Sequence, residues 1–237
     1  MIWGRRFWFM NLNENTLSEQ PVLEWLKELG YEYAFGPDIA PGGAFMERGN
    51  SREVVLEARL KRSLRKINPE IPENKINEVA EEIIKYQHQD IELGNQEMFR
   101  KLTEGVKADI KDKNGDLRGE FVKIIDFKNP ENNEFLVVNQ FSIQGNSVRI
   151  PDVVVFVNGI PIAVFELKNP TDEKATIVDA FSQIHDLYKK EIPKLFFYNQ
   201  ISQAFVAQSV LGKHSSNRMP QNPFRLAIKD LAIFSLF

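Results

Sequence analysis

The sequence contains no cysteine and only three histidines, which excludes several kinds of site. Without cysteine there is no disulfide framework, no thiolate zinc site and no cysteine nucleophile. The histidines, His88, His185 and His214, lie far apart in the chain. A histidine-rich metal site or a serine-type catalytic triad is therefore poorly supported.

A large excess of positive charge and long apolar runs are also missing. The formal net charge is −3 at pH 7, which is not typical of a domain that binds nucleic acid mainly by bulk electrostatics. No apolar run reaches transmembrane length. The N-terminal segment MIWGRRFWFM is too short for the apolar region of a signal peptide and lacks a small-residue cleavage site. We therefore expect a cytoplasmic protein without a membrane segment.

The N-terminal half of the chain carries helical patterns. Thr16-Leu-Ser-Glu19 has the capping-box pattern of a helix start, and Gly30 is placed to end that helix. Residues 31–35 read as a short strand. Further helices are expected over residues 52–66, 74–89 and 95–104. With 237 residues, 43% of them hydrophobic, the chain is long enough for one or two globular domains with a real core.

The period then changes from helical to strand-like. Five consecutive strands are expected, at Val106–Ile110, Phe121–Phe127, Phe135–Ile143, Val148–Val157 and Ile160–Leu167. A helix over about 173–191 and a strand at Leu195–Tyr198 follow. A strand, a crossover helix and another strand indicate a parallel pairing. The predicted fold is α/β, a mixed sheet flanked by helices, with an N-terminal helical block.

One segment is clearly basic. The sequence ARLKRSLRK, residues 58–66, lies within an expected helix. It is consistent with a solvated helix face or with a patch that contacts phosphate groups.

The segment RIPDVVVFVNGIPIAVFELKNP, residues 149–170, is an apolar hairpin with charges at one end. Glu166 and Lys168 lie two apart on one strand and therefore share a face. Asp152 begins the partner strand. Two neighbouring carboxylates repel unless a cation joins them, and carboxylate oxygens suit Mg²⁺. The alternative is a strand-end salt bridge between Lys168 and a carboxylate.

The turn of this hairpin constrains any shared site. A two-residue Asn158-Gly159 turn would pair Val157 with Ile160 and, continued, Asp152 with Phe165. Asp152 and Glu166 would then point to opposite faces of the sheet. A shared metal site therefore predicts either an odd register at the turn or a bulge between the turn and the acids.

The hairpin resembles the catalytic hairpin of the nuclease domain in the R (HsdR-like) subunit of type I restriction enzymes, which belongs to the PD-(D/E)xK superfamily. Other segments resemble the same region in the same order. They are LEWLKELGYEYAFGPDIAP, ERGNSREVVLEARLKRSLRKINPEIP, IIDFKNPENNEFLVVNQF and IPKLFFYN. The resemblance covers about residues 16–199 and implies a restriction-endonuclease-like core. We expect a tail at 1–15, a nuclease domain at 16–211 and a C-terminal extension at 212–237 that does not resemble the family, with the motor domains absent.

The resemblance also implies roles for individual residues. Asp152 and Glu166, with the backbone carbonyl of Leu167, would hold Mg²⁺, and Lys168 would position or activate the attacking water. Other branches of the superfamily add an acid from the first helix, a place that Glu19 occupies here.

The family further carries a glutamine and a tyrosine four residues apart on the helix after the E-x-K strand. Tyr188 matches the tyrosine, but Gln183 lies five residues before it. Five residues of a regular α-helix span about 500°, so the two side chains would diverge. A one-residue π-bulge would return both to one face, and we predict such an irregularity.

The implied function is a Mg²⁺-dependent DNA endonuclease domain of a type I restriction R subunit. Its substrate would be double-stranded DNA, with sequence recognition supplied by methyltransferase (M) and specificity (S) subunits. ATP is expected only in the full-length subunit, because no segment here matches G-x-x-x-x-G-K-[ST]. The alternatives are a catalytically silent docking module of the R subunit and a free-standing PD-(D/E)xK repair nuclease.

Overall fold

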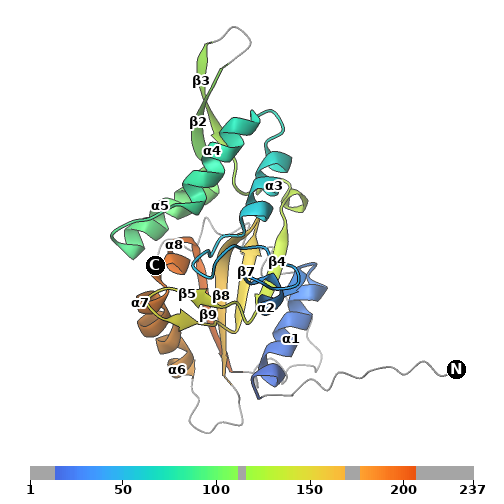
Figure 1. Ribbon diagram of the computed structural model, residues 1–237, viewed down its shortest axis with the longest axis vertical. Helices are drawn as coiled ribbons and strands as arrows, with labels where there is room; N and C mark the ends of the chain where they lie inside the picture. The colour runs from blue at the N-terminus through green and yellow to red at the C-terminus, as the bar shows by residue number, and fades with distance from the viewer. Residues whose placement is uncertain (1–13, 112–115, 169–176, 207–237) are drawn as a thin grey trace, which may run out of the picture.

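The computed structural model describes residues 14–111, 116–168 and 177–206. Its centre is a five-stranded mixed sheet with the order β1-β4-β7-β8-β9 (Figure 1). The two outer pairings are parallel and the two inner pairings are antiparallel. The strands are β1 (Glu32–Phe35), β4 (Phe135–Asn139), β7 (Val153–Val157), β8 (Ile160–Lys168) and β9 (Ile201–Val206). The predicted α/β class with a mixed sheet is confirmed.

The two faces of the sheet bury different sets of side chains, because residues alternate between faces along each strand. Helix α1 (Glu14–Glu28) covers one face through Val22, Leu23 and Leu26, which pack with Val153 and Phe165. The other face carries the larger core, which includes Val154, Phe156 and Val164. The same core contains side chains from α3 (Glu57–Ile67), α4 (Glu73–Ile84), α5 (Ile91–Glu104), α8 (Pro193–Tyr198) and the segment that includes Ile184 and Tyr188.

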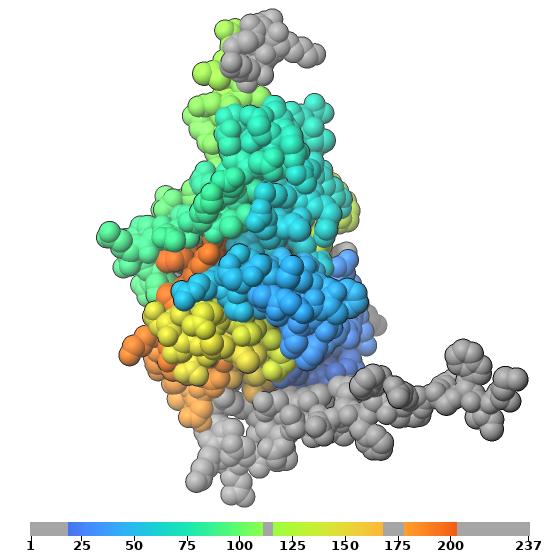
Figure 2. Space-filling model, in the orientation of Figure 1, coloured from blue at the N-terminus to red at the C-terminus, as the bar shows by residue number. Residues whose placement is uncertain are grey.

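Smaller elements complete the described structure. A hairpin of β2 (Val106–Lys111) and β3 (Leu117–Val122) projects beyond α4, and Figure 2 shows the same projection at the surface. The remaining elements are α2 (Gly36–Ile39), a 3₁₀ turn (Pro130–Asn132), β5 (Ile143–Gln144), β6 (Val148–Arg149), α6 (Ile177–Ser182), a π-helix (Gln183–Tyr188) and α7 (Lys189–Glu191). None of the helices in these described ranges is long and apolar enough to cross a membrane.

The strand predicted at Leu195–Tyr198 is wrong. Residues 195–198 are buried in helix α8, which starts at Pro193, instead of forming a strand. A short buried apolar run has no period that separates a helix from a strand, and proline is favoured in the first helical turn. The parallel partner of β8 is β9 instead, so the predicted crossover pairing exists.

Other predicted boundaries are corrected by specific contacts. The strand predicted to start at Phe121 leaves the ladder after Val122, because the Asn68 side chain binds both the N–H and the carbonyl of Lys123. The long strand predicted from Val148 is interrupted near Pro151, which lacks an N–H donor. The strand predicted over 135–143 ends at Asn139, where the next residue takes a left-handed backbone. The helix predicted from Arg52 begins at Glu57.

The first helix ends as predicted and begins differently. Gly30 has a φ of +90°, its N–H donates to the Lys27 carbonyl, and the N–H of Tyr31 donates to the Leu26 carbonyl. This is a Schellman motif. The predicted capping box is wrong, because the helix begins at Glu14 and Thr16 lies inside it.

Gly30→Ala is expected to lower the free energy of unfolding by about 1–2 kcal/mol, the cost of a left-handed non-glycine residue. The expected loss is purely conformational, because no atom lies within 4 Å of the added Cβ. Gly49→Ala is the matched control, since its Cβ would meet only Glu53 Oε1 at 3.7 Å and Oε2 at 3.9 Å, and its φ is not positive. Urea unfolding measures both variants, and equal losses would contradict the assigned motif.

Candidate active site

The hairpin bulges where the predicted site requires it. Asn158 and Gly159 have positive φ angles of 53° and 78°, and the turn pairs Val157 with Ile160, as a two-residue type I′ turn does. The register then shifts between Val155 and Phe156, so that Val153 pairs with Phe165. Continuing this register by one residue places Asp152 opposite Glu166. The expected bulge between the turn and the acids is therefore confirmed.

Asp152 is tied directly to the opposite strand. Its Oδ2 atom accepts a hydrogen bond of 2.7 Å from the backbone N–H of Leu167. Asp152 precedes Val153 and Glu166 follows Phe165, so both acids share the face of the larger core. Glu166 lies two residues before the end of β8, and β8 ends at the lower end of the sheet in Figure 1.

Glu166 is almost fully buried, with 3% of its surface exposed, and it is held by a tyrosine. The Tyr188 hydroxyl donates to Glu166 Oε2 at 3.0 Å, and Gln183 Nε2 donates to the Tyr188 oxygen at 2.7 Å. Burial, the negative charge of Glu166 and that of Asp152 raise the pKa of Tyr188. The tyrosine therefore stays protonated and acts as a donor.

The predicted helix irregularity is confirmed. Residues Gln183–Tyr188 form a π-helix, and it brings the two side chains into contact although they are five residues apart. Gln183 and Tyr188 are one residue further apart than the glutamine and tyrosine of the family, and the wider turn of the π-helix accommodates the extra residue. The helical region starts at Ile177 within the described residues, and the predicted residues 173–176 lie outside them.

Glu19 reaches the same end of the sheet from helix α1. It is 3% exposed, and its two carboxylate oxygens accept hydrogen bonds from Asn139 Nδ2 (2.9 Å) and Gln140 Nε2 (2.8 Å). Burial raises the pKa of the Glu19 carboxyl, the bonds from the two amides lower it, and the negative charge of Asp152 raises it further. Glu19 therefore lies near Asp152 and does not serve the predicted capping box.

Two predicted site residues are described only in part. Lys168 is the last residue of β8, and its side chain lies outside the described part of the structure. Leu167 follows Glu166 and engages Asp152 through its N–H. The role of its carbonyl as a metal ligand stays a prediction.

The acids at this end of the sheet offer oxygen ligands, the kind that Mg²⁺ prefers. Among the described residues, no group of three or more His, Cys, Asp or Glu side chains is arranged to hold a metal ion. Asp152 and Glu166 remain as two carboxylates, each one residue beyond the last paired residues of the hairpin, Val153 and Phe165. They fit Mg²⁺, which is usually bound through one or two carboxylates and keeps several waters.

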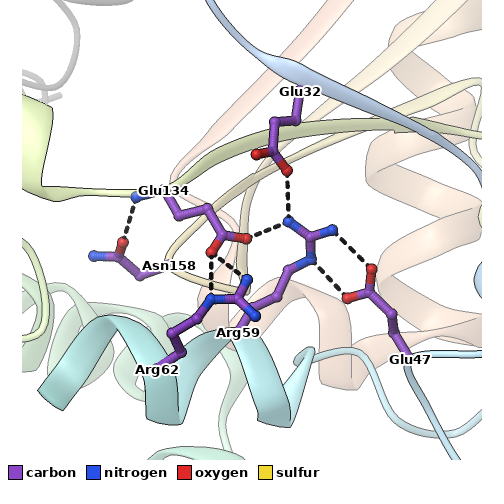
Figure 3. Close-up of polar contacts among 6 residues, drawn as sticks. All are labelled: Glu32, Glu47, Arg59, Arg62, Glu134 and Asn158. Carbon is purple, nitrogen blue, oxygen red and sulfur yellow. Dashed lines mark hydrogen bonds and ion pairs between the residues drawn. The ribbon is translucent and has the colours of Figure 1, made fainter. Parts of the chain in front are cut away.

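The basic segment of α3 lies at the other end of the sheet and contacts acids of this chain. Arg59 is 13% exposed and forms ion pairs with Glu32, Glu47 and Glu134, and Arg62 also contacts Glu134 (Figure 3). Glu134 lies beside the hairpin turn, because its N–H donates to Asn158 Oδ1. These contacts weigh against the phosphate-patch interpretation, although Arg59 is more buried than a solvated helix face implies.

Sequence reasoning missed Asn139 and Gln140. Both lie where β4 ends, in the segment VVNQF, and an amide pair after a buried strand was the available signal. Their partner Glu19 is about 120 residues away in sequence, so no local pattern connects them.

A mixed sheet flanked by helices, with carboxylates gathered at one end, is consistent with a restriction-endonuclease-like domain. Comparison with known families is more specific. The family described as type I restriction enzyme R protein N terminus matches residues 11–209, and the chain belongs to this family.

Two relatives match most of the chain. The chain is 38% identical over 220 residues to the type I restriction enzyme HindI endonuclease subunit of Haemophilus influenzae, covering 91% of this chain and 20% of the relative. It is also 38% identical over 194 residues to the putative type I restriction enzyme MjaIXP endonuclease subunit of Methanocaldococcus jannaschii, covering 80% of this chain and 18% of the relative. The chain thus spans about a fifth of the length of these relatives.

Proposed function

We propose that this chain is the Mg²⁺-dependent DNA endonuclease domain of a type I restriction enzyme R subunit, with a PD-(D/E)xK site. The observation that carries the proposal is the hairpin bulge: it pairs Val153 with Phe165, so that this register, continued by one residue, sets Asp152 opposite Glu166 on one face. Membership of the R protein family and the names of the relatives support it. The substrate is double-stranded DNA, and the M and S subunits supply sequence recognition.

The proposed chemistry is hydrolysis of a phosphodiester bond. Asp152, Glu166 and the Leu167 carbonyl would hold Mg²⁺, which supplies Lewis-acid activation of the phosphate and of a water molecule. Lys168, two residues after Glu166, orients that water or stabilises the charge that develops on the phosphate. Tyr188 holds the Glu166 carboxylate in one orientation, and Gln183 in turn orients the tyrosine.

The test is cleavage of double-stranded DNA by the R subunit assembled with its M and S subunits, with ATP supplied for the full-length subunit. Cleavage should stop when a chelator removes Mg²⁺ and return when Mg²⁺ is restored. A docking module would assemble with the M and S subunits, but cleavage by the complex would not depend on Asp152 and Glu166. A free-standing repair nuclease would cleave without co-purifying with M and S subunits.

Tyr188→Phe is expected to lower the cleavage rate by about 10- to 100-fold, as the loss of a group that orients a metal ligand commonly does. The fold should be kept, because only one hydroxyl is removed. Tyr86→Phe is the matched control: its hydroxyl also donates to a glutamate, Glu97 Oε2 at 2.9 Å, but in the helical block. Equal cleavage by both variants would remove Tyr188 from the proposed site.

A further inference from the structure

Two amide side chains, Asn139 and Gln140, lie where strand β4 ends and face helix α1. We propose that they are positioning residues of the nuclease site: they hold the Glu19 carboxylate beside Asp152, where it accepts a hydrogen bond from a water molecule bound at the metal. This inference rests on the proposed function and assigns it a further pair of residues.

The first observation is how completely the amides orient the carboxylate. Asn139 Nδ2 donates to Glu19 Oε2 at 2.9 Å, and Gln140 Nε2 donates to Oε1 at 2.8 Å. A carboxylate with one donor on each oxygen cannot rotate about its terminal bond without losing both. Each oxygen keeps a second lone pair, so the held carboxylate can still accept from water.

The second observation is that the amides themselves are held. The Tyr33 hydroxyl donates to Asn139 Oδ1 at 2.9 Å, which directs the Asn139 Nδ2 group toward Glu19. The backbone N–H of Gln140 lies 3.3 Å from the Asp152 carbonyl, to which it donates. Gln140 therefore contacts Glu19 with its side chain and Asp152 with its backbone, which fixes the two acids relative to each other.

The third observation is the backbone of Gln140. Its φ is +56°, a left-handed conformation that is uncommon for a residue other than glycine, asparagine or aspartate. A Cβ on Gly36 would lie 2.2 Å from the Gln140 carbonyl oxygen, so this approach requires glycine at position 36. Strain of this kind persists where surrounding structure imposes it, and it clusters at functional sites.

A purely structural role for the amides explains less. Val22, Leu23 and Leu26 already pack α1 onto the sheet. An apolar residue at position 19 would add to that contact, whereas a buried carboxylate has a desolvation cost even when it is hydrogen-bonded. The carboxylate at position 19 and the amides that bind it are therefore better explained by the site than by helix docking.

The experiment measures Mn²⁺ binding to the 237-residue chain by calorimetry. Asn139→Ala and Gln140→Gly are each expected to weaken Mn²⁺ affinity by about tenfold or more. Glycine is chosen at position 140 because it accepts the positive φ while removing the amide. In a Glu19→Ala background, adding Gln140→Gly should change the affinity by less than about twofold, because the amide then has no carboxylate to hold.

Asn132→Ala is the matched control. It removes a hydrogen bond of 2.8 Å that Asn132 Nδ2 donates to Asp126 Oδ2, and Asn133 joins Asp126 to the hairpin-turn residue Asn158. It should leave Mn²⁺ affinity unchanged. Wild-type affinity in the two amide variants, or an equal loss with and without Glu19, would overturn the inference. Mn²⁺ binding that persists in Asp152→Asn, or no binding by the wild type, would instead overturn the proposed function. The Mg²⁺ concentration for half-maximal cleavage by the assembled complex should rise in the two amide variants and stay unchanged in Asn132→Ala.

Discussion

Glu166→Gln is expected to lower DNA cleavage by the assembled complex by at least about a hundredfold, the size that follows the loss of one electrostatic stabiliser. The substitution removes the charge that would bind Mg²⁺ and keeps an oxygen that can accept from Tyr188 at the position of Oε2. Asp152→Asn should behave in the same way, because an amide oxygen can still accept from the Leu167 N–H. Both variants should fold, since removing one of two neighbouring negative charges relieves repulsion.

Initial cleavage rates on circular double-stranded DNA, at saturating Mg²⁺, measure the effect. Co-purification with M and S subunits and an unchanged urea midpoint show that each variant assembles and folds. Glu97→Gln is the matched control, because Glu97 also accepts a hydrogen bond from a tyrosine, Tyr86, but lies in α5. If Glu166→Gln and Asp152→Asn cut DNA as fast as Glu97→Gln does, the two acids are not the site.

The bulge of the hairpin could be predicted from the sequence, because the turn sequence and the need for two acids on one face together allow few strand registers. Alternation alone does not choose a register here, since β7 is buried on both faces. The requirement that Asp152 and Glu166 share a face does choose, and it predicts the bulge. The same reasoning on Gln183 and Tyr188 predicts a π-helix, since a regular helix separates residues five apart.

Other features could not be predicted because their cause lies in distant contacts. The helix at 195–198 could not be assigned from the sequence, because these four residues are buried among side chains from both helices and strands and carry no period of their own. The hydrogen bonds from Asn139 and Gln140 to Glu19 depend on how α1 crosses the sheet. The π-helix was predictable from the family spacing, but the left-handed Gln140 was not, because glutamine has no marked preference for that conformation.

Arg59→Met is expected to lower the free energy of unfolding by about 3 kcal/mol, since breaking a buried ion pair by removing one partner leaves uncompensated charge. The Arg59 side chain is 13% exposed, and its guanidinium makes a two-point contact with Glu47, at 2.6 and 2.7 Å. It also contacts Glu134, whose N–H is bound by the turn residue Asn158 (Figure 3). Without Arg59, two partly buried glutamates lose their shared cation beside the hairpin turn.

Arg65→Met is the control on the same helix, because its ion pair with Glu73 joins side chains that are 47% and 56% exposed. Exposed pairs contribute about 0–1 kcal/mol, so this variant should unfold almost as the wild type does. Urea unfolding at neutral pH compares the two variants. Equal losses would show that the Arg59 cluster is not a buried ion network.

DNA affinity of the assembled complex, measured against salt concentration, should have the same slope in both variants and the wild type. A slope reduced by about one in Arg59→Met would instead make α3 a phosphate-contacting helix, as each lost phosphate contact reduces the slope by about that amount.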